Sequence, residues 1–414
     1  MELNIDQKKV LEVIKNKENA FITGGAGVGK SFLVSQIKDY FIESEINYSI
    51  TAMTGSAAVL INGRTIHSFM GIGLAKGSPQ DLIRKIKRNP MIYKTLVHLR
   101  ALIIDEVSML SDILFDKIAK IFSILHISNK PFGNLQVILV GDMSQLKPIE
   151  GDYCFKAEQW NDCHFEVNVL TKNMRVQNDQ LFKEILDRLR WGICKDDDLD
   201  ILDELRITTF PDDIIPTRLF SKNKDVDELN NLELGKLISE SNPGIVYKVK
   251  YPNNPLKLKT STNYVVSNKI NESLKLCVGA QVIVTRNIDQ DLGIVNGTRG
   301  TIIKFDLDYI LIKLLDQREY SLTFFHVKSD DLNDPNVDFK YIPLKLAWGI
   351  SIHSSQGMTI DALEIDLGSS IFTEGQAYTG LSRARSLSSI KIKKLLKRSF
   401  KTNKDVIAFY EKYN

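Results

Sequence analysis

The chain has 414 residues, of which 43% are hydrophobic and 25% are charged, and its formal net charge is +3. This length suffices for two or three domains with sizeable cores. The small net charge gives no overall electrostatic sign of nucleic-acid binding, so any basic groove has to be local. Apolar runs such as residues 137–140 are too short to span a bilayer.

The first residues and the cysteines indicate a soluble, intracellular protein. The sequence begins with a charged stretch and lacks the apolar segment of a signal peptide. The four cysteines are far apart and form no CxxC pair. We therefore expect a reducing compartment, with neither a zinc site nor a disulfide framework. These features do not distinguish a nucleus, a mitochondrion, a bacterial cytoplasm and a virus-infected cell.

Short apolar runs alternate with helical patterns in the first part of the chain. The runs lie at residues 20–23, 49–51, 101–105 and 136–142. Continuous apolar runs of this length predict buried parallel strands in an α/β doubly wound sheet. The last two runs end in an acidic residue, at the strand end where such sheets bind ligands.

Two segments depart from this pattern. Residues 71–98 hold basic helical turns between Gly and Pro breakers, which predicts a small insertion. From about 290 to 345, β-branched runs with an Asn296-Gly297 turn signal predict a small β barrel inserted in a second α/β domain. The chain ends in a predicted helix with Asn403 as its N-cap.

A glycine-rich stretch between a predicted strand and a predicted helix matches the phosphate-loop pattern G-x4-G-K-S. Its residues are Gly24, Gly25, Ala26, Gly27, Val28, Gly29, Lys30 and Ser31. The glycines let backbone N–H groups converge on phosphates, while Lys30 reaches the β and γ phosphates and Ser31 ligates Mg²⁺. We therefore predict a Mg²⁺-dependent nucleotide triphosphate site.

Five further residues are candidates for hydrolysis. Asp105 ends an apolar strand and is expected to hold Mg²⁺, with Glu106 placed to orient or deprotonate the attacking water. Gln145 in "VGDMSQL" is expected to sense the γ-phosphate or to position water, although a polar surface loop explains it equally well. Arg175 and Arg383 are expected to stabilise charge on the γ-phosphate. A single arginine more often forms a surface salt bridge, so this prediction depends on the other motifs.

Two stretches suggest contacts with a nucleic-acid strand, which is held through phosphates and base stacking. "AMTGSAA" places Thr54, Gly55 and Ser56 at a strand-to-helix corner that suits a phosphate. "RTIHSFMG" offers His67 and Ser68 to the backbone and Phe69 to a base. For Phe69, ordinary core packing and base stacking are equally good interpretations.

Several motifs together resemble those of a known family. In the order found in superfamily-1 helicases, the chain carries the phosphate loop, "IIDEVSML", "PFGNLQVILVGDMSQLKPI", "LTKNMR", "ISIHSSQGMT" and "QAYTGLSRAR". More narrowly, it resembles the PIF subfamily of 5′→3′ DNA helicases, relatives of RecD and Dda. The segments 51–73 and 274–288 are also PIF-like, and the resemblance extends over about residues 3–400.

The resemblance implies two RecA-like domains with ATP between them. The first would span residues 1–175, with the insertion at 71–98 as subdomain 1B. The second would comprise 176–290 and 344–414, with an SH3-like subdomain 2B at 291–343. The implied activity is ATP-driven, Mg²⁺-dependent unwinding of DNA in replication, repair or recombination. The implied partners are single-stranded DNA and DNA forks. G-quadruplex DNA, a single-strand binding protein and a polymerase are further expected partners. The protein is expected to be a monomer that does not act at a membrane.

The resemblance also implies further site residues. Gln7 would contact adenine, although Asn4 and Gln7 are also spaced as an N-cap and its capping-box partner. Gly357 would lie on the nucleotide side. The implied contacts with DNA in the second domain are His353, Ser354 and Gln356. Ser354 stands where the family usually has Lys, which puts the strength of DNA coupling in doubt.

Four alternatives stay open at this point. An RNA helicase of the same superfamily shares most of the motifs, and a translocase that strips proteins from DNA is compatible with Ser354. An oligomeric AAA-type ATPase takes its arginine finger from a neighbour, whereas Arg175 and Arg383 suit a site closed within one chain. A non-catalytic nucleic-acid binding module would not need the intact Lys30 and Glu106.

Overall fold

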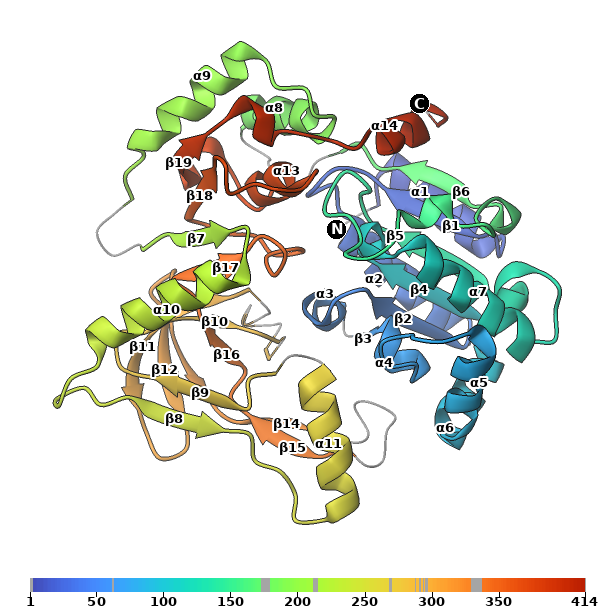
Figure 1. The fold of residues 1–414 in the computed structure, drawn as a ribbon, viewed down its shortest axis with the longest axis horizontal. Coiled ribbons are helices and arrows are strands. Elements are labelled where there is room, and N and C mark those ends of the chain that lie inside the picture. The colour runs from blue at the N-terminus through green and yellow to red at the C-terminus, as the bar shows by residue number, and fades with distance from the viewer. Residues whose placement is uncertain are drawn as a thin grey trace. The chain divides into compact units, whose positions relative to one another are not determined.

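A computed structural model describes most of the chain, drawn as a ribbon in Figure 1. The described residues are 3–61, 63–172, 179–210, 215–267, 270–286, 288–289, 292, 294, 297–328 and 337–413. The chain divides into two compact units. The first comprises Met1–Thr208 and Ile365–Asn414, and the second comprises Thr209–Glu364.

The first unit is built on a six-stranded parallel sheet with the strand order β3-β2-β4-β5-β1-β6. The strands are β1 (Ala20–Thr23), β2 (Tyr48–Ala52), β3 (Arg64–Thr65), β4 (Ala101–Asp105), β5 (Gln136–Val140) and β6 (Glu166–Val169). The helices before β6 are α1 (Ile5–Lys15), α2 (Lys30–Glu43), α3 (Gly55–Leu60), α4 (Ile66–Met70), α5 (Pro79–Lys87), α6 (Pro90–His98) and α7 (Asp112–Leu125). After β6 come α8 (Gln180–Arg190), α9 (Asp196–Glu204), α13 (Gln376–Leu381), β19 (Ile390–Leu395) and α14 (Lys404–Glu411).

The central strands are apolar because both faces of the sheet are covered. Every residue of β1, β4 and β5 is buried, as expected for parallel strands between two helical layers. Since these strands run in one direction, their carboxyl ends share one edge of the sheet. The loop after β1 and the acidic residues that end β4 and follow β5 therefore come together there.

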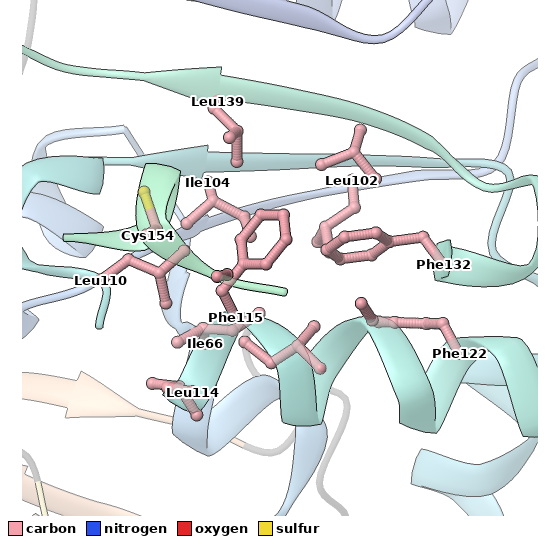
Figure 2. Packing of buried hydrophobic residues seen from close by; sticks show 14 of the residues in the cluster. Ile66, Leu102, Ile104, Leu110, Leu114, Phe115, Phe122, Phe132, Leu139 and Cys154 are labelled. Atoms are coloured by element: carbon pink, nitrogen blue, oxygen red, sulfur yellow. The ribbon is translucent and has the colours of Figure 1, made fainter. Parts of the chain in front are cut away.

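A large hydrophobic core lies on one face of this sheet. Figure 2 shows Phe115 and Phe122 of α7 packed with Phe132 and with strand residues such as Leu102. The ring centroids of Phe115 and Phe132 are 5.3 Å apart in an edge-to-face arrangement, which aromatic pairs favour. The segment predicted as an insertion, residues 71–98, forms α5 and α6, which contribute Leu82, Ile83, Ile86 and Leu96 to the same core.

The end of the chain also belongs to this core. Asn403 caps α14 by accepting a hydrogen bond from the Asp405 N–H at 2.8 Å, as predicted. Phe409 stacks on Phe155 with ring centroids 4.4 Å apart. Helix α14 thus packs on the core of the first unit, and the bounds of the two RecA-like domains stay a prediction.

The second unit contains most of the antiparallel strands. Its largest sheet has the order β13-β12-β11-β10-β16, and the smaller pairs are β8–β9 and β14–β15. Strands β17 and β7 are parallel neighbours in a four-stranded sheet of order β17-β7-β18-β19. The strands are β7 (Thr217–Phe220), β8 (Ile245–Lys248), β9 (Ser273–Leu276), β10 (Gln281–Val284), β11 (Arg299–Phe305), β12 (Ile310–Leu314), β13 (Glu319–Leu322), β14 (Phe325–Val327), β15 (Phe339–Tyr341), β16 (Leu344–Leu346) and β17 (Gly349–Ser351). The helices are α10 (Asn223–Leu237) and α11 (Pro255–Ser267), and β18 (Leu363–Leu367) crosses the boundary between the units.

The predicted fold class is confirmed. The chain has parallel α/β sheets and antiparallel sheets, and strands β11 to β15 lie in the region where the sequence predicted β structure. In the part of the chain that the structure describes, no helix is both long enough and apolar enough to cross a membrane.

Candidate nucleotide site

The phosphate loop connects β1 to α2 and depends on its glycines. Gly24 has a φ of 141°, and a Cβ there would clash with the Leu170 carbonyl oxygen. Gly29, the N-cap of α2, has a φ of 85° and supplies no side-chain cap. The first amides of α2 are therefore left available to an anion at the positive end of the helix. The predicted residues Gly25, Ala26, Gly27, Val28 and Ser31 lie in this loop or in the first turn of α2.

Lys30 folds back over the loop. Its Nζ donates hydrogen bonds to the carbonyl oxygens of Gly24 at 2.8 Å and Gly25 at 2.9 Å. Burial lowers the pKa of Lys30, and the nearby carboxylates of Asp142 and Glu106 oppose that shift. The ammonium group thus lies where it can be transferred from two carbonyls to a phosphate.

Asp105 and Glu106 are adjacent carboxyl groups at the end of β4. The Glu106 N–H donates to Asp105 Oδ1 at 2.8 Å, and Glu106 has a φ of 52°, in the left-handed region. Burial and the neighbouring Glu106 raise the pKa of Asp105 to about 7. Asp105 is buried and Glu106 is half-buried. Adjacent carboxyl groups favour a divalent cation, so this pair fits the predicted Mg²⁺.

Asp142 is a further buried acid, which the sequence analysis did not single out. Arg190 of α8 donates to it through Nη2 at 3.0 Å and Nε at 3.2 Å. Tyr378 of α13 donates from its hydroxyl to Asp142 Oδ2 at 3.2 Å and accepts from the Ala26 N–H of the phosphate loop at 3.1 Å. Burial alone would raise the pKa of Asp142, but Arg190 and Lys30 hold it below its usual value.

Gln145 and Arg383 come together although 238 positions separate them in the chain. Arg383 donates through Nη2 to Gln145 Oε1 at 3.1 Å and through Nε to the Thr379 carbonyl at 2.9 Å. Burial lowers the pKa of Arg383, while Glu106 opposes the shift. A Cβ on Gly375 would clash with the carbonyl of Gln145, so the start of α13 lies directly against this loop. Arg175, the other predicted arginine, lies outside the described residues.

Gln7 forms the capping box of α1. Its backbone N–H donates to Asn4 Oδ1 at 2.9 Å, and its side-chain Oε1 accepts from the Asn4 N–H at 3.0 Å. A glutamine that pairs with adenine uses both the oxygen and the nitrogen of its amide. The two roles therefore compete for Oε1, and the adenine contact stays a prediction.

The predicted strand contacts of the first unit lie at the end of β2 and on α4. Thr54 and Gly55 occupy the corner before α3, where Thr54 Oγ1 accepts from the Ala57 N–H at 3.2 Å; Ser56 is the second residue of that helix. His67 and Ser68 are partly exposed on α4, and burial lowers the pKa of His67.

Phe69 is the residue of this predicted set that is a candidate for base stacking. It is only 7% exposed and packs in the large core, so the structure favours the core-packing interpretation over base stacking. Stacking on a base would require the ring to leave its neighbours.

The remaining predicted residues belong to the second unit. His353, Ser354, Gln356 and Gly357 follow β17 in consecutive turns. Gln356 is fully buried, and the Ser351 hydroxyl donates to Ser354 Oγ at 2.9 Å. Gly357 has a φ of 79°, which suits glycine.

Comparisons with known proteins identify the family. The family model described as "PIF1-like helicase" matches residues 2–198, and the one described as "DNA helicase Pif1, 2B domain" matches residues 262–305. The ATP-dependent DNA helicase Pif1 of Bdellovibrio bacteriovorus is 32% identical, over 100% of this chain and 92% of that protein. This chain belongs to the PIF1-like helicase family.

Other relatives extend the match. The ATP-dependent DNA helicase PIF1 of Danio rerio is 33% identical over 99% of this chain, and this chain spans 64% of its length. Among solved structures, Pif1 helicase from Candida albicans superposes with a TM-score of 0.85 at 31% identity, covering 100% of both chains. Pif1 from Bacteroides, in complex with ADP-AlF3 and ssDNA, superposes with a TM-score of 0.72 at 26% identity, over 100% of this chain and 97% of that one.

Three residues of this PIF1-like site escaped the sequence analysis, for different reasons. Asp142 had a signal, because its apolar run ends in an acid just as the run before Asp105 does. Tyr378 lies within the quoted motif "QAYTGLSRAR" but its hydroxyl has no sequence pattern of its own. Arg190 sits in an ordinary amphipathic helix, so only the structure reveals its pairing with Asp142.

Proposed function

We propose that this PIF1-like chain is a monomeric motor that hydrolyses ATP to move 5′→3′ along single-stranded DNA and to unwind the duplex ahead. Family membership makes it an ATP-dependent DNA helicase; the direction, the oligomeric state and the residue roles are the proposal. The observation that carries it is the meeting of the phosphate loop with Asp105, Glu106, Asp142, Gln145 and Arg383 in one compact unit.

Each group has a chemical role in this proposal. The amides of the phosphate loop and Lys30 bind the phosphates. Glu106 takes a proton from the attacking water, and Gln145 orients that water. Arg383 stabilises charge that develops on the γ-phosphate.

Ser31 and Asp105 would hold Mg²⁺. When bound, this ion neutralises phosphate charge during transfer. Burial and Glu106 raise the pKa of Asp105 to about 7, and a neighbouring cation would favour its ionised form.

The proposed DNA track has contacts on both units. Thr54, His67 and Ser68 on the first unit, and His353 and Ser354 on the second, would hold the backbone of the strand. Single-stranded DNA and forks are the proposed substrates. Quadruplex DNA, a single-strand binding protein and a polymerase stay predicted partners, and an intracellular location stays a prediction.

One experiment tests motor and direction together. A duplex with either a 5′ or a 3′ single-stranded tail is unwound with Mg·ATP, beside the Lys30→Ala variant. We expect unwinding from the 5′ tail alone, and its loss in Lys30→Ala, with circular dichroism unchanged because Lys30 is a loop-facing side chain. Unwinding from the 3′ tail would contradict the direction, and normal turnover by Lys30→Ala would contradict the site.

A translocase that moves on DNA without unwinding is the second candidate. Ser354 favours it, because a family lysine that could grip the strand is missing there. DNA-stimulated ATP hydrolysis without strand separation from either tail would select this candidate.

A further inference from the structure

The last helix of the chain places a buried hydroxyl next to the phosphate loop. Tyr410 of α14 is 2% exposed. Its Oη shares a hydrogen bond with Thr23 Oγ1 at 2.5 Å and accepts from the Met143 N–H at 3.1 Å. Thr23 is the last residue of β1, and Met143 belongs to the loop after β5. One hydroxyl therefore contacts two segments that are about 120 positions apart in sequence. Figure 1 labels α14, β1 and β5.

Both tied segments lead directly to proposed catalytic groups. Thr23 precedes Gly24, whose carbonyl accepts from Lys30 Nζ at 2.8 Å. Met143 lies between Asp142 and Gln145, the partner of Arg383. The loop after β5, which holds Gln145, is here called the Gln145 loop. Its distance from the phosphate loop thus depends on the hydrogen bonds of Thr23 and Met143 to Tyr410 Oη.

The ring of Tyr410 supports the same arrangement. The guanidinium of Arg190 lies 5.2 Å from its ring centroid, within the range of a cation–π contact. Arg190 in turn holds Asp142. Phenylalanine would keep this ring contact and the packing on Phe409, so packing alone does not account for the hydroxyl.

We propose that Tyr410 is a positioning residue of the ATP site, whose hydroxyl fixes the spacing between the phosphate loop and the Gln145 loop. The proposal rests on the ATP hydrolysis proposed above. Tyr410 lies outside every motif found in the sequence. In this proposal, helix α14 positions groups of the ATP site in addition to packing on the core.

The first test does not require ATP turnover. Hydrogen–deuterium exchange is compared in the nucleotide-free wild type, Tyr410→Phe and the control Tyr413→Phe, whose tyrosine is 43% exposed on the same chain end. We expect faster exchange in Tyr410→Phe at residues 22–30 and 141–146, because a buried Met143 N–H loses its acceptor. Tyr413→Phe should match the wild type. Unchanged exchange at both segments in Tyr410→Phe would overturn the proposal.

The second test is steady-state ATP hydrolysis by the same three proteins. We expect Tyr410→Phe to lower kcat roughly tenfold, the effect of one well-placed hydrogen bond, with KM changed less than about twofold. A tyrosine that only stabilises the fold would lower the melting temperature and leave kcat at 20–25 °C unchanged, which would overturn a positioning role. A wild-type protein without ATPase activity would contradict the proposed function. The exchange data alone would then show whether the Tyr410 hydroxyl fixes the spacing of the two loops.

A double variant checks that the two hydroxyls act together. Thr23→Val keeps the shape of this buried strand residue and removes its hydroxyl. If Tyr410 acts through Thr23, the variant with both changes loses about as much kcat as the more severe single variant. Losses that multiply would mean independent effects and would contradict the shared role.

Discussion

Arg383 is a buried cation whose described hydrogen bonds all go to neutral oxygens. It contacts the Thr379 carbonyl, the Ser382 hydroxyl and the Gln145 amide oxygen, and it is only 2% exposed. A buried guanidinium is costly unless anions compensate it, and Glu106 and Asp142 offset part of this charge. The γ-phosphate is the further anion that the proposed function supplies.

This arrangement predicts a specific kinetic defect for Arg383→Gln. We expect kcat for ATP hydrolysis to fall by about 10³-fold or more, because an arginine at a γ-phosphate acts mainly in the transition state. The Kd for a fluorescent ADP analogue should change less than about tenfold, since ADP lacks the γ-phosphate. Arg398→Gln, at an exposed arginine of the same unit, is the control and should behave as wild type. A defect in ADP binding alone would argue against the assigned role.

Single residues also show where sequence patterns stop being informative. Lys30, Asp105 and Gln145 were predicted because each has a fixed place after an apolar strand. Phe69 could not be assigned, since the same ring suits a core or a base and only its 7% exposure separates the two. Gln7 was open for a similar reason, because its spacing from Asn4 satisfies a helix cap as well.

At the scale of elements, a buried ion pair joins helix α8 to the loop after strand β5. The side chains of Arg190 and Asp142 are 9% and 0% exposed. Removing one partner leaves the other charge buried and unpaired. The free-energy cost of that unpaired charge is larger than the stability that the ion pair adds relative to two apolar residues.

We therefore expect Arg190→Met to lower the free energy of unfolding by about 3–5 kcal/mol. Arg206→Met is the matched control, because Arg206 pairs with Asp203 on the surface with side chains 44% and 55% exposed. Such exposed pairs contribute less than about 1 kcal/mol. Urea unfolding followed by circular dichroism measures both variants. Equal losses in the two would show that the Asp142 carboxylate is compensated by other groups.

Elements differed in how well the sequence defined them. Strands β1, β4 and β5 were predictable because burial on both faces demands continuous apolar residues. Helices α5 and α6 followed from their Gly and Pro breakers. The docking of α14 on the core of the first unit was not predictable, because a short amphipathic helix carries no information about its partner.

At the scale of the whole molecule, the proposed nucleotide site is assembled from distant parts of one chain. Residues 24–31 meet residues 376–383 through Tyr378, and Arg383 contacts Gln145 in the loop after β5. The order of the helicase motifs predicted that both ends contribute. It could not show the contacts themselves, since those depend on the path of some 350 intervening residues.

The net charge of +3 is too small to hold DNA by long-range attraction, so the strength of the grip depends on single local cations. Ser354 is one place where a cation is missing relative to the family pattern. It lies in the turns after β17, next to His353, and its Oγ accepts from the Ser351 hydroxyl at 2.9 Å. A lysine there would give up that hydrogen bond and extend a charge toward the proposed DNA track.

Ser354→Lys should therefore bind single-stranded DNA more tightly and with a stronger dependence on salt. Each new phosphate contact on a single strand steepens the slope of log K against log salt by about 0.7. Fluorescence anisotropy with a labelled oligonucleotide between 50 and 200 mM salt measures this slope. Ser241→Lys, at an exposed serine of the same unit, adds the same charge away from the motifs and should leave the slope unchanged. Equal slopes for the two variants would mean that residue 354 does not face the strand, and a steeper slope for Ser354→Lys alone would place it on the track.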